Sequence, residues 1–186
     1  GSVGDWTQET GDDLNWTVQS GSTKSNGTGP SSASAGSYYI YTEASGNNTG
    51  YPNKVAILTS PCFDFTAESN ATFIFDYHMY GTNMGSLQLQ ASTDGSSWVT
   101  LWSKSGNQGD TWTTQNVDLA SYVGTSVQLR FVGTTGTGFR SDMAVDNVSV
   151  TTGGTPPAGT DLTLTITFDN YPEETSWTLV NSGGST

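Results

Sequence analysis

The sequence predicts an all-β protein. Charged residues make up only 12 % of the 186 residues, and six Trp and eight Tyr stand among many Gly, Ser, Thr and Asn residues. This composition is typical of short strands joined by polar turns and differs from that of disordered chains. Apolar and polar residues also alternate in several segments that are separated by turn-forming residues. The length is sufficient for a single core of ordinary size.

The alternation predicts eight strands. The dipeptide Asp94-Gly95 separates the fourth strand from the fifth and is typical of a tight hairpin turn. The strands are expected at residues 37–42, 54–59, 71–80, 86–92, 98–103, 111–119, 126–132 and 143–151.

A linker is predicted close to the C-terminus. Residues 153–160 contain two prolines and three glycines, which is the composition of an interdomain linker. We therefore expect one domain over residues 1–152 and a linker over 153–161. Residues 162–186 are then the truncated start of a following β module, a short C-terminal β tail.

Two of the predicted strands carry ionisable residues within the alternation. The run Phe73–Gly81 contains Asp76 and His78, and the run Asp142–Val150 contains Asp146. Both runs resemble the MAM module of extracellular adhesion proteins and secreted proteases. Further segments that resemble this family stand in order around them, at Asp5–Gln8, Asp12–Trp16, Gly27–Pro30, Gly36–Tyr41 and Ala56–Pro61.

The resemblance covers roughly residues 5–150. It implies a jelly-roll β-sandwich of two antiparallel sheets and a binding or adhesive role. MAM modules usually begin with a strand before the Asp-Trp pair, and this sequence starts at Gly1, too late to include that strand. Because an unpaired sheet edge accepts extended segments, we expect residues 162–169 to pair there, within the chain or in a strand-exchanged dimer. In the alternative, the tail is only the start of the next module.

The charge excludes some partners. The net charge is −12, with five basic residues in the whole chain, so a phosphate backbone would be repelled. We therefore expect no nucleic acid partner. No stretch approaches the roughly 18 apolar residues of a spanning helix, so no membrane insertion is expected.

The cysteine content points to a compartment and an origin. Cys62 is the single cysteine, which rules out an internal disulfide and a cysteine-based metal cluster. Animal members of the family are secreted with disulfides. The absence of disulfides here, with the Asn, Thr, Ser and Gly bias, suggests a secreted or cell-surface bacterial protein.

A calcium site is predicted at Asp146. This residue alternates in phase with Ala144 and Val148, so its carboxylate points with small apolar residues and needs a partner. With few basic residues available, Ca²⁺ is a suitable partner. The resemblance implies Asp12 and Asp13 as co-ligands. In the alternative, Asp146 accepts backbone N–H bonds and the Asp12-Asp13 pair caps a turn.

A ligand surface is predicted on the polar rows of three strands. In residues 73–80, 86–91 and 126–132, apolar residues alternate with polar ones, so each strand has one polar side. If the three strands share a sheet, these side chains form one face suited to sugars: Asp76, His78, Tyr80, Gln88, Gln90, Gln128 and Arg130. In the alternative, the face is merely solvated. Trp98 and Trp102 alternate on one side of their strand and are expected to be buried rather than to stack on sugars.

Catalysis finds little support in the sequence. A lone His78 and a lone Cys62 exclude most catalytic triads, and no metalloprotease His pair occurs. We expect a non-catalytic extracellular binding or adhesion module, binding carbohydrate and targeting an attached secreted enzyme or adhesin. The alternative is a spacer that mediates association of protein domains or subunits.

Overall fold

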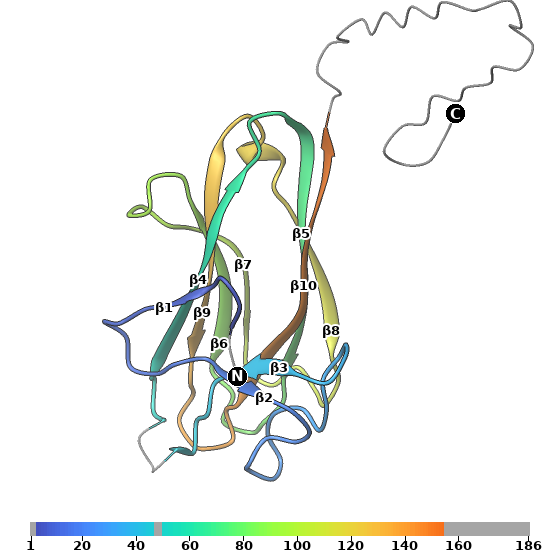
Figure 1. Ribbon diagram of the computed structural model, residues 1–186. Helices are drawn as coiled ribbons and strands as arrows, with labels where there is room; N and C mark the ends of the chain where they lie inside the picture. The colour runs from blue at the N-terminus through green and yellow to red at the C-terminus, as the bar shows by residue number, and fades with distance from the viewer. Residues whose placement is uncertain (1–2, 47–49, 155–186) are drawn as a thin grey trace, which may run out of the picture. The chain divides into compact units, whose positions relative to one another are not determined.

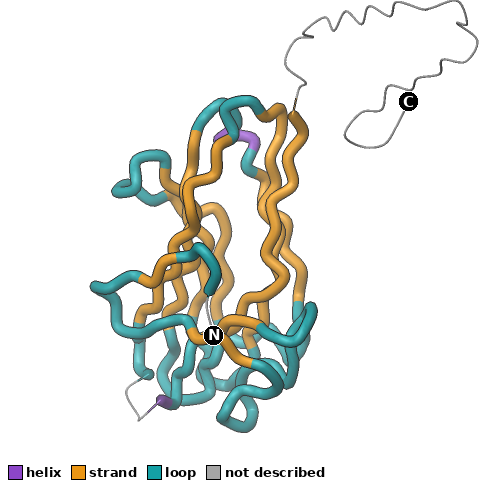
Figure 2. The backbone as a smooth tube through the Cα atoms, in the orientation of Figure 1, coloured by secondary structure: helices purple, strands orange, loops and turns teal. Residues whose placement is uncertain are grey.

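Two antiparallel sheets of five strands pack face to face as a jelly-roll β-sandwich (Figure 1). The computed structural model describes residues 3–46 and 50–154. Sheet A has the order β1 (Thr7–Gln8), β4 (Val55–Asp64), β9 (Ser126–Thr134), β6 (Ser86–Ser92) and β7 (Val99–Ser105). Sheet B has the order β2 (Thr17–Gln19), β3 (Tyr39–Tyr41), β10 (Met143–Gly154), β5 (Glu68–Met79) and β8 (Thr113–Asp118). Strands run along the body of the sandwich, and loops connect them at both ends (Figure 2).

Each of the eight predicted strands corresponds to a strand of the structure, which confirms the fold class. The pattern missed β1 and β2, which contain two and three residues and are too short for alternation to be visible. Gly153 and Gly154 extend β10 instead of opening a linker. The expected linker from residue 155 and the tail at 162–186 lie outside the described residues.

The core lies between the inner faces of the two sheets. β5 contributes Phe73 and Phe75 from sheet B, and β9 contributes Phe131 from sheet A. The rings of Phe75 and Phe131 meet edge to face, with centroids 5.1 Å apart. Burial of each such side chain contributes about 1.5–3 kcal/mol. The residues between them on the same strands therefore face outward, where candidate ligand surfaces lie.

The assumption that one sheet holds all three polar rows is wrong. β5 pairs with β10 and β8 in sheet B, while β6 and β9 are neighbours in sheet A. The chain passes from one sheet to the other between Met79 and Ser86, so strands that are consecutive in sequence lie in different layers. The predicted polar face is therefore divided between the two outer surfaces of the sandwich.

Candidate functional site

Asp76 lies on the outer face of sheet B but is only 5 % exposed. The hydroxyl groups of Ser34 and Thr114 each donate to its carboxylate at 2.6 Å, and Nδ2 of Asn147 donates at 3.2 Å. Burial acts to raise the pKa of Asp76, but these hydrogen bonds outweigh burial and hold that pKa below its ordinary value. The carboxylate is thus occupied by protein donors.

Asp146 holds the same loop as Asp76. Its Oδ2 accepts the backbone N–H groups of Ser34 at 2.8 Å and Ala35 at 2.9 Å, and its Oδ1 accepts the N–H of Asn147 at 2.8 Å. These bonds match the alternative in which Asp146 accepts backbone N–H donors. The two aspartates together fasten the loop around Ser34 over sheet B.

His78 and Tyr80 also belong to sheet B and its border, away from the glutamines of sheet A. His78 is 2 % exposed, and its Nε2 lies 3.2 Å from Oδ1 of Asp110. Burial lowers the pKa of His78, although the carboxylate of Asp110 opposes this shift. The ring of Trp112 lies 5.4 Å from the imidazole and that of Tyr80 lies 6.5 Å away. This histidine is packed among aromatic rings and does not face solvent.

Asp12 and Asp13 cap the edge of β4 where β1 ends. Asp12 Oδ2 accepts the N–H of Ile57 at 2.6 Å, and Asp13 Oδ2 accepts the N–H of Val55 at 3.0 Å. Lys54 Nζ also lies 3.0 Å from Asp13 Oδ1. Burial raises the pKa of Asp12, and the Val55 N–H lowers that of Asp13. Both carboxylates satisfy backbone donors of β4 in the stretch that β1 does not pair.

The remaining four residues of the predicted ligand surface gather on the outer face of sheet A. Arg130 lies over the ring of Trp98, with its guanidinium carbon 4.1 Å from the ring centre. Arg130 Nε donates to Gln90 Oε1 at 2.8 Å, and Gln90 Nε2 donates to Gln88 Oε1 at 2.8 Å. Gln128 stands on the same strand as Arg130 and donates to Ser60 at 3.4 Å. Among the described residues, no hydrogen bond engages the two terminal nitrogens of Arg130.

Two local features position Trp98 on this surface. The turn after β6 is fixed by Asp94, whose Oδ1 accepts the N–H groups of Ser96 and Ser97; these bonds hold the pKa of Asp94 below its ordinary value. A β-bulge in β7 then shifts the register between Leu89 and Gln90. Because of the bulge, Trp102 packs inward on Phe75 and Tyr77, as expected, while Trp98 faces outward.

A shallow pocket adjoins the Trp98 ring. Its volume is about 430 Å³, within the range of small-molecule sites. Glu9 lies on the β1 side of the pocket, and its negative charge acts on Arg130. Burial lowers the pKa of Arg130, which indicates a partly desolvated guanidinium. Hydrogen-bond donors, an acceptor and an aromatic ring thus surround one hollow. The other lining residues are Thr7, Gln8, Thr10, Thr59, Ser60, Gly95 and Gln128.

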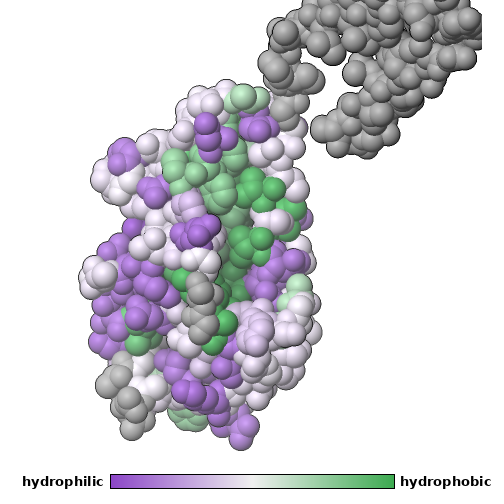
Figure 3. All heavy atoms as spheres, in the orientation of Figure 1, coloured by the Kyte–Doolittle hydropathy of each residue, from purple (hydrophilic) through white to green (hydrophobic). Residues whose placement is uncertain are grey.

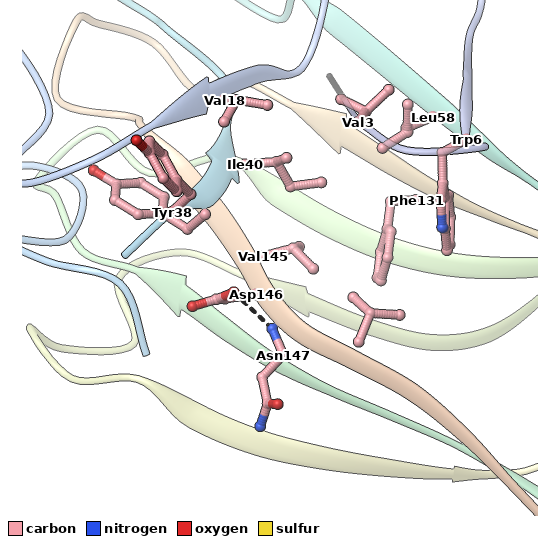
Figure 4. A pocket seen from close by; sticks show the side chains of 12 residues that line it. Val3, Trp6, Val18, Tyr38, Ile40, Leu58, Phe131, Val145, Asp146 and Asn147 are labelled. Carbon is pink, nitrogen blue, oxygen red and sulfur yellow. Dashed lines mark hydrogen bonds between the residues drawn. The ribbon is translucent and has the colours of Figure 1, made fainter. Parts of the chain in front are cut away.

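An apolar groove opens between the sheets on a different part of the surface. Apolar atoms form a band along the opening between β4 and β10 (Figure 3). Trp6 and Phe131 stack at its base with ring centroids 5.5 Å apart, and Ile40 and Val145 line another wall (Figure 4). The volume is about 260 Å³. This groove therefore differs in character from the polar surface at Trp98.

Comparison with known families decides the classification. The family model for the MAM domain (meprin/A5/mu) matches residues 1–154. The chain belongs to the MAM family. It is 35 % identical over 169 residues to the mouse MAM domain-containing glycosylphosphatidylinositol anchor protein 2. The match covers 82 % of this chain, which spans only 17 % of the mouse protein.

Solved structures with the same fold include adhesin and carbohydrate-binding domains. A cleaved adhesin domain of Lys-gingipain from Porphyromonas gingivalis superposes with a TM-score of 0.57 at 18 % identity, covering 83 % of this chain and 94 % of that one. A carbohydrate-binding module from Caldicellulosiruptor saccharolyticus, solved with mannohexaose, gives 0.51 at 15 % identity, with coverages of 79 % and 90 %. At these identities the likeness shows the fold alone.

The comparisons and the structure bear on two further expectations about this MAM domain, its bacterial origin and the lack of a membrane-spanning segment. The mouse relative is a vertebrate protein, and the human, rat and chicken relatives are too, so the expected bacterial origin finds no support. Among the described residues, no helix has the length and apolar character needed to cross a membrane.

The predicted calcium ligands do not form one site in this MAM domain. Asp12 and Asp13 bind the edge of β4 in sheet A, whereas Asp146 lies in sheet B beside the Ser34 loop. Among the described residues, no group of three or more His, Cys, Asp or Glu side chains is placed to hold a metal. These three carboxylates therefore do not fit a shared calcium ion.

Asp142, which the sequence reasoning did not single out, is a buried carboxylate directly before β10. Its side chain is fully buried, and Oδ1 accepts the N–H of Ala44 at 2.9 Å, while Oδ2 has no partner. Thr42 Oγ1 is a second buried oxygen without a partner. Burial, with the nearby charge of Glu43, raises the pKa of Asp142 to about 7. A calcium ion there would need backbone carbonyls or hydroxyls to complete six to eight oxygens.

Sequence reasoning missed Asp142 and expected Trp98 to be buried, for different reasons. Asp142 precedes the alternating part of β10, so no break in the pattern marked it. Trp98 followed the Asp94-Gly95 turn and had a visible signal, an aromatic residue next to a turn, but the bulge that directs it outward has no mark in the sequence. Trp98 and Arg130 are distant in sequence, so their contact could not be predicted from either segment alone.

Proposed function

We propose that this MAM domain is a non-catalytic extracellular binding module and that it binds glycans at the surface formed by Trp98, Arg130, Gln88, Gln90 and Gln128. Its family supplies adhesion-type modules, and the relative quoted above is by name an anchor protein. The single observation that carries the proposal is the fixed Arg130 guanidinium over Trp98 with its terminal N–H groups free of described partners.

The chemistry of the surface suits sugar hydroxyls. Arg130 and the glutamine amides donate hydrogen bonds, Glu9 and the amide oxygens accept them, and the Trp98 ring provides an apolar wall of the pocket. Arg130 covers one face of the indole, so a sugar ring would contact the remaining exposed part of Trp98. Stacking then supplements hydrogen bonding and does not replace it.

The charge of the surface favours a neutral glycan. Glu9 acts on Arg130, and the whole chain carries a net charge of −12. A uronate or sulfate group would gain contact with Arg130 but would approach against a negative field. The described residues of the structure place no second Arg or Lys side chain in the lining of this pocket.

A glycan array probed with the full chain tests the proposal. We expect saturable binding to neutral oligosaccharides and weaker binding to sulfated or uronate-containing ones. Titration calorimetry of the best hit gives the affinity. The absence of any saturable binding to the array at protein concentrations up to the millimolar range would contradict the proposal.

Protein association is the second candidate function. The apolar groove at Trp6 and Val145 favours it, because exposed apolar surface of this kind commonly marks an interaction site. A spacer or docking role at the groove and glycan binding at Trp98 use different surfaces, so one domain has room for both. A strand-exchanged dimer through residues 162–169 stays a prediction, tested by the mass in solution of a chain that ends at residue 154.

A further inference from the structure

A second polar hollow borders sheet A at the end of β9 that lies away from Trp98. Its volume is about 400 Å³, close to that of the hollow beside Trp98. None of the residues that line it is charged. Ser86, Ser105 and Thr134 contribute hydroxyl groups to the lining. Hydroxyl groups both donate and accept hydrogen bonds, so this hollow matches the hydroxyl groups of a neutral sugar.

Three hydroxyl side chains of the hollow form a row across neighbouring strands. Ser86 on β6 is the direct cross-strand partner of both Ser105 on β7 and Thr134 on β9. Direct partners project from the same face of a sheet. Because Leu87 is buried in the core and successive residues alternate, the row faces outward, as Gln88 does. Among the described residues, no hydrogen bond engages these three hydroxyl groups.

The backbone around the row is fixed before any ligand binds. The buried Ser141 hydroxyl accepts the N–H of Gly85 at 3.2 Å and that of Gly136 at 2.7 Å. A Cβ atom on Gly85 would lie 1.9 Å from the backbone oxygen of Thr134, and one on Gly136 would lie 1.7 Å from that of Asn83. The two segments therefore touch through their backbones. A preorganised site of this kind loses little entropy when it binds.

Outward side chains connect this row to the Arg130 surface. Arg130 and Thr134 are four residues apart on β9, which is about 13 Å at roughly 3.3 Å per residue. Val132 lies between them, and its cross-strand partners are Ile57 and Gln88. The Oε1 of Gln88 already accepts a hydrogen bond, whereas its Nε2 makes none among the described residues. The face thus presents a donor and an apolar strip between the two hollows.

The spacing of the hollows selects the shape of the ligand. A single sugar ring that occupies one hollow does not reach the other across about 13 Å, but a chain of sugar units does. Both hollows lie along one strand, so the chain must be extended. Hexopyranoses with β-1,4 linkages form extended ribbons, while α-1,4 linkages make the chain coil. The apolar ring faces of a ribbon would contact Val132 and Ile57, and its edge hydroxyls would reach the polar groups on either side.

We propose that the outer face of sheet A binds a linear, neutral, β-1,4-linked oligosaccharide that extends from the Trp98 and Arg130 surface to the hydroxyl row of Ser86, Ser105 and Thr134. The inference rests on the proposed glycan binding at Trp98 and adds the length and linkage of the ligand. The absence of charged side chains from the second hollow agrees with a neutral chain at both ends.

Calorimetric titration of the full chain with oligosaccharides of increasing length tests the inference. The probes are β-1,4-linked glucose and mannose oligomers from one to six units, with the α-1,4-linked glucose hexamer for comparison. In at least one β-linked series, we expect the hexasaccharide to bind at least tenfold more tightly than the disaccharide. This gain exceeds what a longer chain obtains from the greater number of ways to occupy one hollow. The α-linked hexamer should bind at least tenfold more weakly than the β-linked one.

Substitutions in the hydroxyl row separate the two ends of the surface. Ser86→Tyr fills the centre of the row and should lower hexasaccharide affinity at least tenfold while disaccharide affinity stays unchanged. Thr134→Val keeps the branched side chain and removes only the hydroxyl, so we expect a smaller loss that is again confined to the hexasaccharide. Asn116→Tyr introduces the same ring at an exposed position on the outer face of sheet B and should bind like the wild type. Circular dichroism melting verifies the fold of each variant.

Three results would overturn the inference and leave a glycan site at Trp98 intact. The first is equal affinity for the disaccharide and the hexasaccharide. The second is hexasaccharide affinity that neither Ser86→Tyr nor Thr134→Val changes. The third is binding of the α-linked hexamer as tight as that of the β-linked one. An absence of binding to every glycan of the array would instead contradict the proposed function itself, and this inference with it.

Discussion

Asp76 on β5 and Asp146 on β10 are direct cross-strand partners in sheet B. Like charges in this arrangement are destabilising unless donors compensate them. Here Ser34 supplies donors to both, from its hydroxyl to Asp76 and from its backbone N–H to Asp146. The two aspartates that interrupt the alternating strands therefore share a structural task, which is to fasten the loop around Ser34.

Removal of the Asp76 carboxylate should destabilise the domain. Asp76→Ala leaves the donors of Ser34, Thr114 and Asn147 without an acceptor, and we expect a loss of about 3 kcal/mol in the free energy of unfolding. Denaturant unfolding measures it. Ser34→Ala, which removes one hydroxyl donor, should cost only about 1 kcal/mol. Equal stability of Asp76→Ala and the wild type would show that the network contributes nothing.

Asp142 should make stability fall as the pH rises. Its pKa is about 7 in the folded domain and near 3.8 in the unfolded chain, so the folded state holds the proton more tightly between these values. The contribution of Asp142 is therefore fully present below about pH 4 and is lost as the pH rises to about 7. Asp142→Asn, which stays neutral, should gain stability relative to the wild type across this interval, by at most about 4 kcal/mol. A difference that does not change with pH would contradict the assignment.

If calcium binds at Asp142, it should raise the melting temperature of the domain. A cation that binds only the folded state raises the melting temperature by mass action. We expect a chelator to lower the melting temperature, calcium to restore it, and Asp142→Asn to lose the response. Asp146→Asn is the matched control, since its carboxylate is engaged by N–H groups. A melting temperature that changes with neither chelator nor calcium would contradict the calcium prediction.

The Asp12-Asp13 pair should protect the edge of β4. With Asp12→Ala, the Ile57 N–H loses an acceptor at 2.6 Å, and we expect a loss of about 1 kcal/mol. The double variant Asp12→Ala/Asp13→Ala should also associate more readily, because free edge donors invite strand pairing. Denaturant unfolding and light scattering provide the two readouts. A double variant as stable and as monodisperse as the wild type would exclude the capping role.

The sequence was informative where structure is local. Alternation has a period of two in any strand, so the inward positions of Phe73, Phe75 and Leu89 followed directly from the pattern. Sheet membership depends on contacts between distant segments, and β5 and β6 are consecutive in sequence yet lie in different sheets. For this reason, the sequence alone could not show that Asp76 and His78 lie in a different sheet from Gln88 and Gln90.

Bulges account for further differences. The bulge at Asn147 breaks the phase of β10, so Val150 packs against the core although Ala144 and Asp146 face outward. The bulge in β7 separates Trp98 from Trp102 in the same way. A single extra residue reverses every following side chain, and neither insertion is visible as a sequence signal.

The pairing of Arg130 with Trp98 carries the proposed function, and calorimetric titration with the best neutral glycan from the array measures it most directly. We expect Trp98→Ala and Arg130→Ala each to lower the affinity at least tenfold with little change in melting temperature, because both side chains lie outside the core. Arg140→Ala removes a second arginine that lies over an aromatic ring, that of Phe139 at 5.2 Å, and should bind like the wild type. Unchanged affinity of the Trp98 and Arg130 variants, or an equal loss in all three, would contradict glycan binding at this surface.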